Sequence, residues 1–265
     1  MSLLPLFCEN FPTYTKDYFD SNVKVLWYNP EFSQSRYPPG QKVSKACTLI
    51  CLLVAQLISQ TELLVDDIER CHKIISIIAE AMIKGNAIHT WSIEEGLISH
   101  PYLSTEEALK IGGRNLYLLR EWTFQVFYER IEKGLFLHIS RFLHKWYKLA
   151  KSKNLFMLLI TCGRTVLFIF QEETYMVSCS LKLVKDIPNV CIILRRGLVI
   201  AQTSIDQLEH LCHWYIEDVL NNCYNAEADQ YELAFLYPYN ASCCGCNSLC
   251  NCGNCYEKHN NRLIE

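Results

Sequence analysis

A cysteine at the start of a buried helix is the residue with the clearest chemical potential in this chain. Cys47 follows the polar loop 41–45 and opens an apolar run that reaches residue 58. The positive end of a helix dipole favours a negatively charged sulfur at such a position, so a nucleophile is possible. Gln41, six residues upstream, could help a backbone N–H to hold an oxyanion. In a plainer interpretation, Cys47 and Cys51 are packed core thiols one helical turn apart.

A cysteine hydrolase also needs a general base, usually a histidine that an Asp or Asn orients. The β-rich region 155–202 contains no histidine. The histidines lie mostly in predicted helices or near the carboxyl terminus: His72, His89, His100, His138, His144, His210, His213 and His259. This distribution argues against catalysis. An active enzyme would need a histidine from the central loop, such as His89 or His100, to reach Cys47.

The carboxyl-terminal segment is rich in cysteine. Cys243 and Cys246 form one C-x-x-C pair and Cys252 and Cys255 form another, which suits tetrahedral Zn²⁺. The five residues between the pairs are fewer than a zinc finger usually has. The cysteines could instead hold a soft metal such as Cu(I), carry lipid, or belong to a disordered thiol-rich tail.

Hydrophobic periodicity predicts helices first and strands later. Ser44 is a candidate cap for the helix 44–59, Gly85-Asn86 ends the helix 66–84, and Ser104 with Glu107 forms a capping box. A helix over 135–151 precedes predicted strands at 155–161, 165–171, 175–180, 190–194 and 198–202. Ser204 caps a last helix, 205–221, and residues 231–237 could add a strand.

This order favours an α+β fold in which N-terminal helices pack against a C-terminal antiparallel sheet. We expect an N-terminal arm (1–24), the α+β domain (25–237) and the Cys-rich tail (238–265). The net charge of −3 and the pI near 6.3 argue against a nucleic-acid partner. The N-terminus lacks the basic region of a signal peptide, and no apolar run is long enough for a transmembrane segment. We therefore expect an intracellular protein, cytoplasmic or nuclear, with reduced thiols.

The layout resembles the papain-like cysteine peptidase fold, in particular the deubiquitinase domain of herpesvirus large tegument proteins and related insect domains. Three stretches carry the resemblance: residues 45–50, residues 163–170 with 175–177, and residues 197–202 with 205–208. The resemblance implies that Cys47 is the nucleophile and that Ser178-Cys179-Ser180 replaces the family's Asp-x-His motif. Ser178 and Ser180 would then occupy the positions of the lost acid and base, and neither hydroxyl can take a thiol proton near neutral pH.

Three hypotheses follow. The preferred one is a catalytically inactive, deubiquitinase-like domain that acts by binding a protein, which could be ubiquitin-like. The second is an active cysteine peptidase with Cys47 as its nucleophile. The third is a metal-binding adaptor that works through the Cys-rich tail. No cofactor is expected for the domain itself, and zinc is expected only in the tail.

Overall fold

An antiparallel sheet of eight strands runs through the molecule, in the order β1-β2-β7-β6-β5-β4-β8-β3. The computed structural model describes residues 11–41, 44–149, 152–171, 189–193 and 197–239. The strands in this part of the chain are β1 (Tyr14–Phe19), β2 (Val23–Tyr28), β3 (Leu119–Phe127), β4 (Asn154–Thr161), β5 (Arg164–Gln171), β6 (Asn189–Ile193), β7 (Val199–Thr203) and β8 (Tyr231–Pro238). The predicted α+β class is confirmed.

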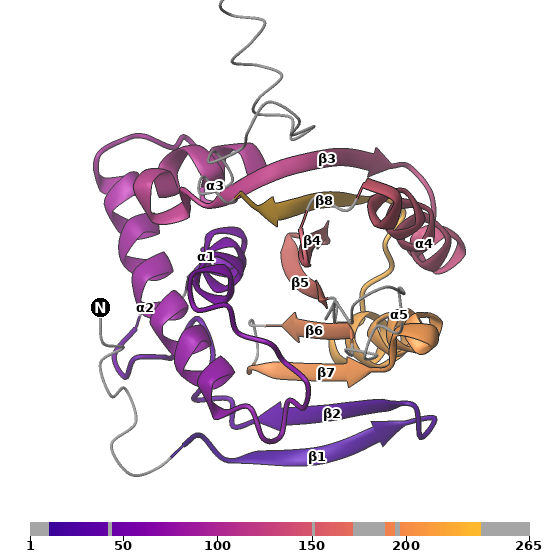
Figure 1. Cartoon of the computed structure of the whole chain (residues 1–265). Coiled ribbons are helices and arrows are strands. Elements are labelled where there is room, and N and C mark those ends of the chain that lie inside the picture. Colours follow the sequence, from indigo (N-terminus) through magenta and orange to yellow (C-terminus); the bar gives the residue numbers. More distant parts are fainter. Residues whose placement is uncertain (1–10, 42–43, 150–151, 172–188, 194–196, 240–265) are drawn as a thin grey trace, which may run out of the picture.

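Helices cover both faces of the sheet (Figure 1). One face carries α1 (Cys47–Gln60), α2 (His72–Glu94), α3 (Thr105–Gly112) and the 3₁₀ turn η1 (Gly113–Leu116). The other carries α4 (Ile131–Leu149), α5 (Leu208–Trp214) and the π-helix η3 (Tyr215–Cys223), with the short turn η2 (Ile205–Gln207) before α5. Each face therefore has its own hydrophobic core. Within the described residues, no helix has the length and apolar character needed to cross a membrane.

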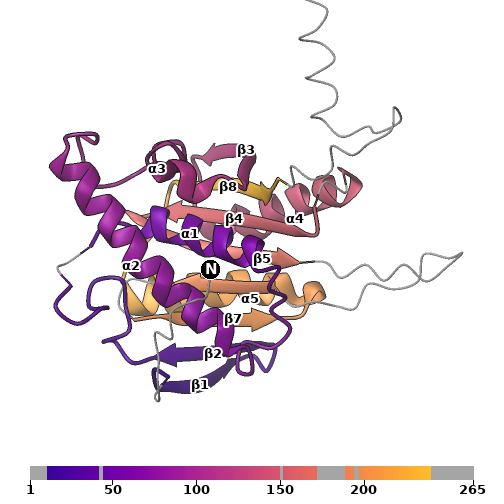
Figure 2. The same cartoon turned by 60° about the vertical axis from the view of Figure 1, so that its left-hand side comes forward.

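Helix α1 lies between α2 and the sheet, as Figure 2 shows. This placement explains why its sequence is apolar on nearly every side. Gly85 lets α2 come close, because a Cβ atom there would lie 2.5 Å from Cγ1 of the buried Ile50. The prediction that Gly85-Asn86 ends the second helix is wrong: α2 continues to Glu94, and Asn86 is buried and donates to the Gln34 carbonyl at 2.8 Å.

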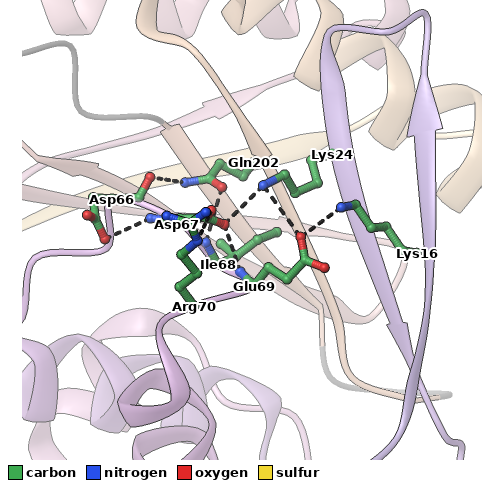
Figure 3. Close-up of polar contacts among 8 residues, drawn as sticks. All are labelled: Lys16, Lys24, Asp66, Asp67, Ile68, Glu69, Arg70 and Gln202. Carbon is green, nitrogen blue, oxygen red and sulfur yellow. Dashed lines mark hydrogen bonds and ion pairs between the residues drawn. The ribbon is translucent and has the colours of Figure 1, made fainter.

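Strand β1 was not expected, since residues 1–40 lack a sustained period and predicted an extended arm. The structure instead forms a β1–β2 hairpin at the edge of the sheet, and β2 pairs with β7. Lys16 and Lys24 on this hairpin bind the loop between α1 and α2, at 2.7 Å to Glu69 and 3.0 Å to Asp67 (Figure 3). The sheet therefore begins before residue 25.

Two buried glutamines hold the same loop against the sheet. Each side-chain amide accepts from one backbone N–H and donates to one backbone carbonyl, as a neighbouring strand would. The pairs are Gln202 with Ile68 N (3.2 Å) and Asp66 O (2.9 Å), and Gln171 with Val65 N (2.9 Å) and Leu63 O (2.8 Å). The loop thus keeps its buried backbone groups paired without becoming a strand.

The other predicted elements compare with the structure as follows. The strands predicted at 155–161, 165–171, 190–194, 198–202 and 231–237 are confirmed as β4, β5, β6, β7 and β8, and residues 175–180 lie outside the described part. Strand β3 was missed. The Ser104–Glu107 capping box is confirmed, whereas Ser44 and Ser204 make no side-chain cap. Helix α1 begins only at Cys47, because the Ser44 hydroxyl accepts from the N–H of Ala46, ahead of the helix.

Candidate functional site

Cys47 is the first residue of α1 and is partly exposed, whereas Cys51 is completely buried. Burial raises the pKa of the Cys51 thiol well above its usual value, and the neighbouring Cys47 adds to this effect. A buried thiol of this kind is chemically inert. Any thiol chemistry on α1 is therefore restricted to Cys47.

The sheet presents a hydroxyl to the Cys47 sulfur. Cys47 Sγ donates to Thr165 Oγ1 on β5 at 3.5 Å, and Thr165 Oγ1 lies 2.8 Å from Thr48 Oγ1. The Thr48 hydroxyl donates to the Leu103 carbonyl at 3.0 Å. Each hydroxyl has a single proton, so Thr165 donates to Thr48 and keeps a lone pair for Cys47. The lone pair of Thr165 Oγ1 therefore faces the Cys47 sulfur and accepts a hydrogen bond from its S–H group.

A two-residue turn sets the position of Thr165. Cys162 and Gly163 connect β4 to β5 and have φ angles of 49° and 66°. Positive φ at both central residues is the geometry of the tight hairpin turn that matches strand twist, and glycine adopts it without strain. This turn fixes the pairing of Ile160 with Thr165 and directs the start of β5 toward the N-terminus of α1.

A small cavity adjoins the Cys47 sulfur. Its volume is about 10 Å³, which is room for roughly one water molecule. The cavity lies where α1, β5, β6 and the π-helix meet, and its lining residues are Cys47, Arg164, Thr165, Val166, Ile193, Tyr215 and Tyr224. No histidine is among them. Burial raises the pKa of Tyr215 well above its usual value, so this phenol stays protonated and cannot act as a base.

The other candidate residues do not line the cavity beside the sulfur. Gln41 lies in the loop before α1, where its N–H donates to the Pro38 carbonyl at 3.0 Å, and it does not line the cavity. His89 is buried and its Nε2 lies 2.9 Å from the Pro101 carbonyl. His100 is exposed and its Nε2 lies 3.6 Å from Glu107. Neither histidine lines this cavity, and the hydrogen bond of the Cys47 thiol seen among the described residues goes to Thr165.

Several predicted site residues fall outside the described residues. These are Ser178 and Ser180, at the expected acid and base positions, and the predicted metal ligands Cys243, Cys246, Cys252 and Cys255. In the part of the chain that is described, no group of three or more His, Cys, Asp or Glu side chains is arranged to hold a metal.

Sequence reasoning missed Thr165 and Thr48. The glycine turn and the following strand were recognised, so the sequence contained the signal that a strand starts near Thr165. The sequence did not reveal that this strand start lies against the first turn of α1. Cys47, the first residue of α1, precedes Thr165 by 118 positions in the chain.

Comparison with known proteins gives a limited result. No protein-family model matches the chain, and no curated protein matches it. Among solved structures, the chain is similar to the ubiquitin-specific protease encoded by a murine cytomegalovirus tegument protein, crystallised with a ubiquitin-based suicide substrate. The identity is 10%, the TM-score is 0.48, and the match covers 83% of this chain and 87% of that one.

Proposed function

We propose that this domain binds a protein partner through a papain-like scaffold and has no peptidase activity. The observation that carries the proposal is the hydrogen bond from the Cys47 thiol to the Thr165 hydroxyl at 3.5 Å: within the described residues the sulfur meets an alcohol, whereas a cysteine peptidase needs an imidazole. The conclusion rests on the contacts of this chain's own residues.

The chemistry follows from that contact. An alcohol cannot take up a thiol proton near neutral pH, and Thr165 already donates its own proton to Thr48. A reaction at Cys47 would therefore lack both thiolate formation and protonation of the leaving group. Losing acid–base assistance alone costs a factor of ~10²–10⁴ in rate.

The partner we propose is a ubiquitin-like protein in a reducing compartment of the cell. The similar viral protease was crystallised with a ubiquitin-based substrate, which motivates ubiquitin as the first partner to test. The seven cysteines within the described residues are all free thiols, in keeping with a reducing compartment. The proposed binding requires no metal, and the zinc predicted for the tail is a separate matter.

A ubiquitin probe with a thiol-reactive group at its carboxyl terminus tests the proposal. We expect no covalent adduct on the wild-type chain by intact mass spectrometry, together with reversible binding of unmodified ubiquitin by calorimetry. An adduct that Cys47→Ala abolishes would refute the inactive assignment. Absence of any binding to ubiquitin would remove this partner.

Two variants of Thr165 test whether the lack of a base beside Cys47 explains the proposed inactivity. Thr165→His brings an imidazole to the sulfur, so we expect faster alkylation of Cys47 by iodoacetamide at pH 7, measured by peptide mass spectrometry. Thr165→Val, which has nearly the shape of threonine but no acceptor, is the matched control and should not gain a base-dependent pH profile. Equal alkylation profiles for the two variants would show that β5 does not face the sulfur.

A further inference from the structure

An apolar groove opens between the β1–β2 hairpin and the π-helix η3. Its volume is about 680 Å³, within the range of about 300–1,000 Å³ that is usual for ligand sites. Aromatic and aliphatic side chains dominate its walls, among them Tyr14, Trp27, Tyr28, Val199 and Val219. Among the described residues, none of those that line it is charged.

The walls of the groove are well supported. Trp27 packs edge-on against Trp214 of α5 with ring centroids 6.2 Å apart, and Tyr14 lies against Tyr28 at 5.3 Å. One wall belongs to a π-helix, a rare conformation that is often found at functional sites. Rigid aromatic walls of this kind bind a partner at low entropic cost because few rotamers are lost on binding.

The groove is continuous with the surroundings of Cys47. Ile193 and Tyr224 line both the groove and the small cavity beside the sulfur. A ligand lying in the groove would therefore have one end close to the start of α1.

Carboxylates lie next to lining residues of the groove. Asp17 follows Thr15 on the same face of β1, and Asp218 precedes Val219 on the π-helix. Burial raises the pKa of Asp218, and the negative charges of Asp17, Glu217 and Asp20 raise it further. Asp17, Glu217 and Asp20 therefore lie within electrostatic reach of Asp218.

Within the described part of the chain, three of these four carboxylates form no ion pair. Glu217 pairs with His213 at 2.9 Å. Among the ion pairs of the described residues, none involves Asp17, Asp20 or Asp218. A ligand that brought a positive charge here would relieve the repulsion between these groups.

We propose that the groove binds an extended segment of another protein, with apolar side chains in the groove and a lysine or arginine at the carboxylates. A ligand that uses both regions must be elongated, which favours a peptide over a compact small molecule. This inference deepens the protein-binding function proposed above and rests on it.

A displayed library of random dodecapeptides, selected on the immobilised full chain, tests the proposal. We expect enrichment of sequences that combine apolar residues with Lys or Arg. The strongest selected peptide is then synthesised with a fluorophore, and its affinity is measured by polarisation. Thr15→Arg places bulk and positive charge at the groove, so we expect affinity to fall about tenfold or more. Gln125→Arg, the same new side chain at an exposed position of β3 on the opposite sheet edge, should leave it unchanged.

A separate variant tests the carboxylates beside the groove. Asp218→Asn removes one carboxylate without changing side-chain size, so we expect about threefold weaker binding and a smaller dependence on salt. The proposal would be overturned if the selection enriched acidic peptides or enriched no sequence. It would also be overturned if Gln125→Arg lowered the peptide affinity as much as Thr15→Arg. Self-association that Thr15→Arg abolishes in light scattering would assign the groove to a second copy and overturn it too. Cys47→Ala should keep full peptide affinity, so a covalent ubiquitin adduct would refute inactivity while leaving this result intact.

Discussion

Replacing Gly85 with alanine should destabilise the protein, although alanine is the better helix former. At an exposed helical position this exchange stabilises by ~1 kcal/mol. At Gly85 the new Cβ would lie 2.5 Å from Ile50 Cγ1 and 3.4 Å from the Ile50 backbone. Cγ1 is a branch atom of a fully buried, β-branched side chain, so it cannot move aside without displacing α1.

The magnitude follows from two opposing effects. Overpacking of a filled core costs ~1–3 kcal/mol, and the gain in helix propensity offsets ~1 kcal/mol of this. We therefore expect Gly85→Ala to lower the free energy of unfolding by as much as about 2 kcal/mol. Cys47 lies one turn before Ile50 on α1, so its contact with Thr165 should also loosen and its alkylation rate should change.

Urea unfolding followed by circular dichroism measures this effect, and α2 offers a matched control. Ala87 is exposed two residues further along the helix, and Ala87→Gly should cost ~1 kcal/mol through propensity alone. Glycine would thus give the more stable protein at position 85, and alanine would give it at position 87. If Gly85→Ala stabilised the protein as much as Ala87→Gly destabilised it, the close contact between α1 and α2 would be refuted.

Three further predictions concern the loop after α1 and the tail. Gln202→Leu leaves the N–H of Ile68 and one carbonyl buried without partners, so we expect a loss of about 2–4 kcal/mol in urea unfolding; a neutral result would mean that water enters the loop. Partial burial raises the pKa of Asp67, but hydrogen bonds from Lys24 and a backbone N–H outweigh it and leave this pKa below its usual value. The stabilisation from Asp67 is therefore present above pH ~4 and is lost as pH falls through the lowered pKa, so the stability gap between wild type and Asp67→Asn should close in acid; a gap independent of pH would contradict the contact. The full chain should carry more zinc by elemental analysis than a chain ending at Tyr239, and equal zinc content would exclude a metal site in the tail.

The sequence predicted the α+β class and most strands of the second half correctly, because strand and helix periods differ and are local properties. It also singled out Cys47 as a candidate nucleophile, and the structure places this partly exposed thiol at the first residue of α1. The start of a helix can be recognised from neighbouring residues, and the polar loop before Cys47 made the position conspicuous.

Errors arose where the function of a residue depends on a distant partner. Gly85 was interpreted as the end of a helix, since glycine usually weakens one. In the structure it is the point where α2 touches Ile50. Strand β1 carries no clear pattern because its residues are almost all exposed, and its pairing with β2 and the contacts of Lys16 with Glu69 hold it in place.

The candidate site shows the same difference between local properties and tertiary contacts. The amino-acid sequence alone indicated that Cys47 is a candidate nucleophile and showed that the β-rich region 155–202 contains no histidine. Only the tertiary structure decided that Thr165 is the group that meets the sulfur, and that the hairpin and the π-helix enclose a groove beside it. The physical reason is that a hydrogen bond or a groove wall depends on the packing of segments more than a hundred residues apart, which local preferences do not encode.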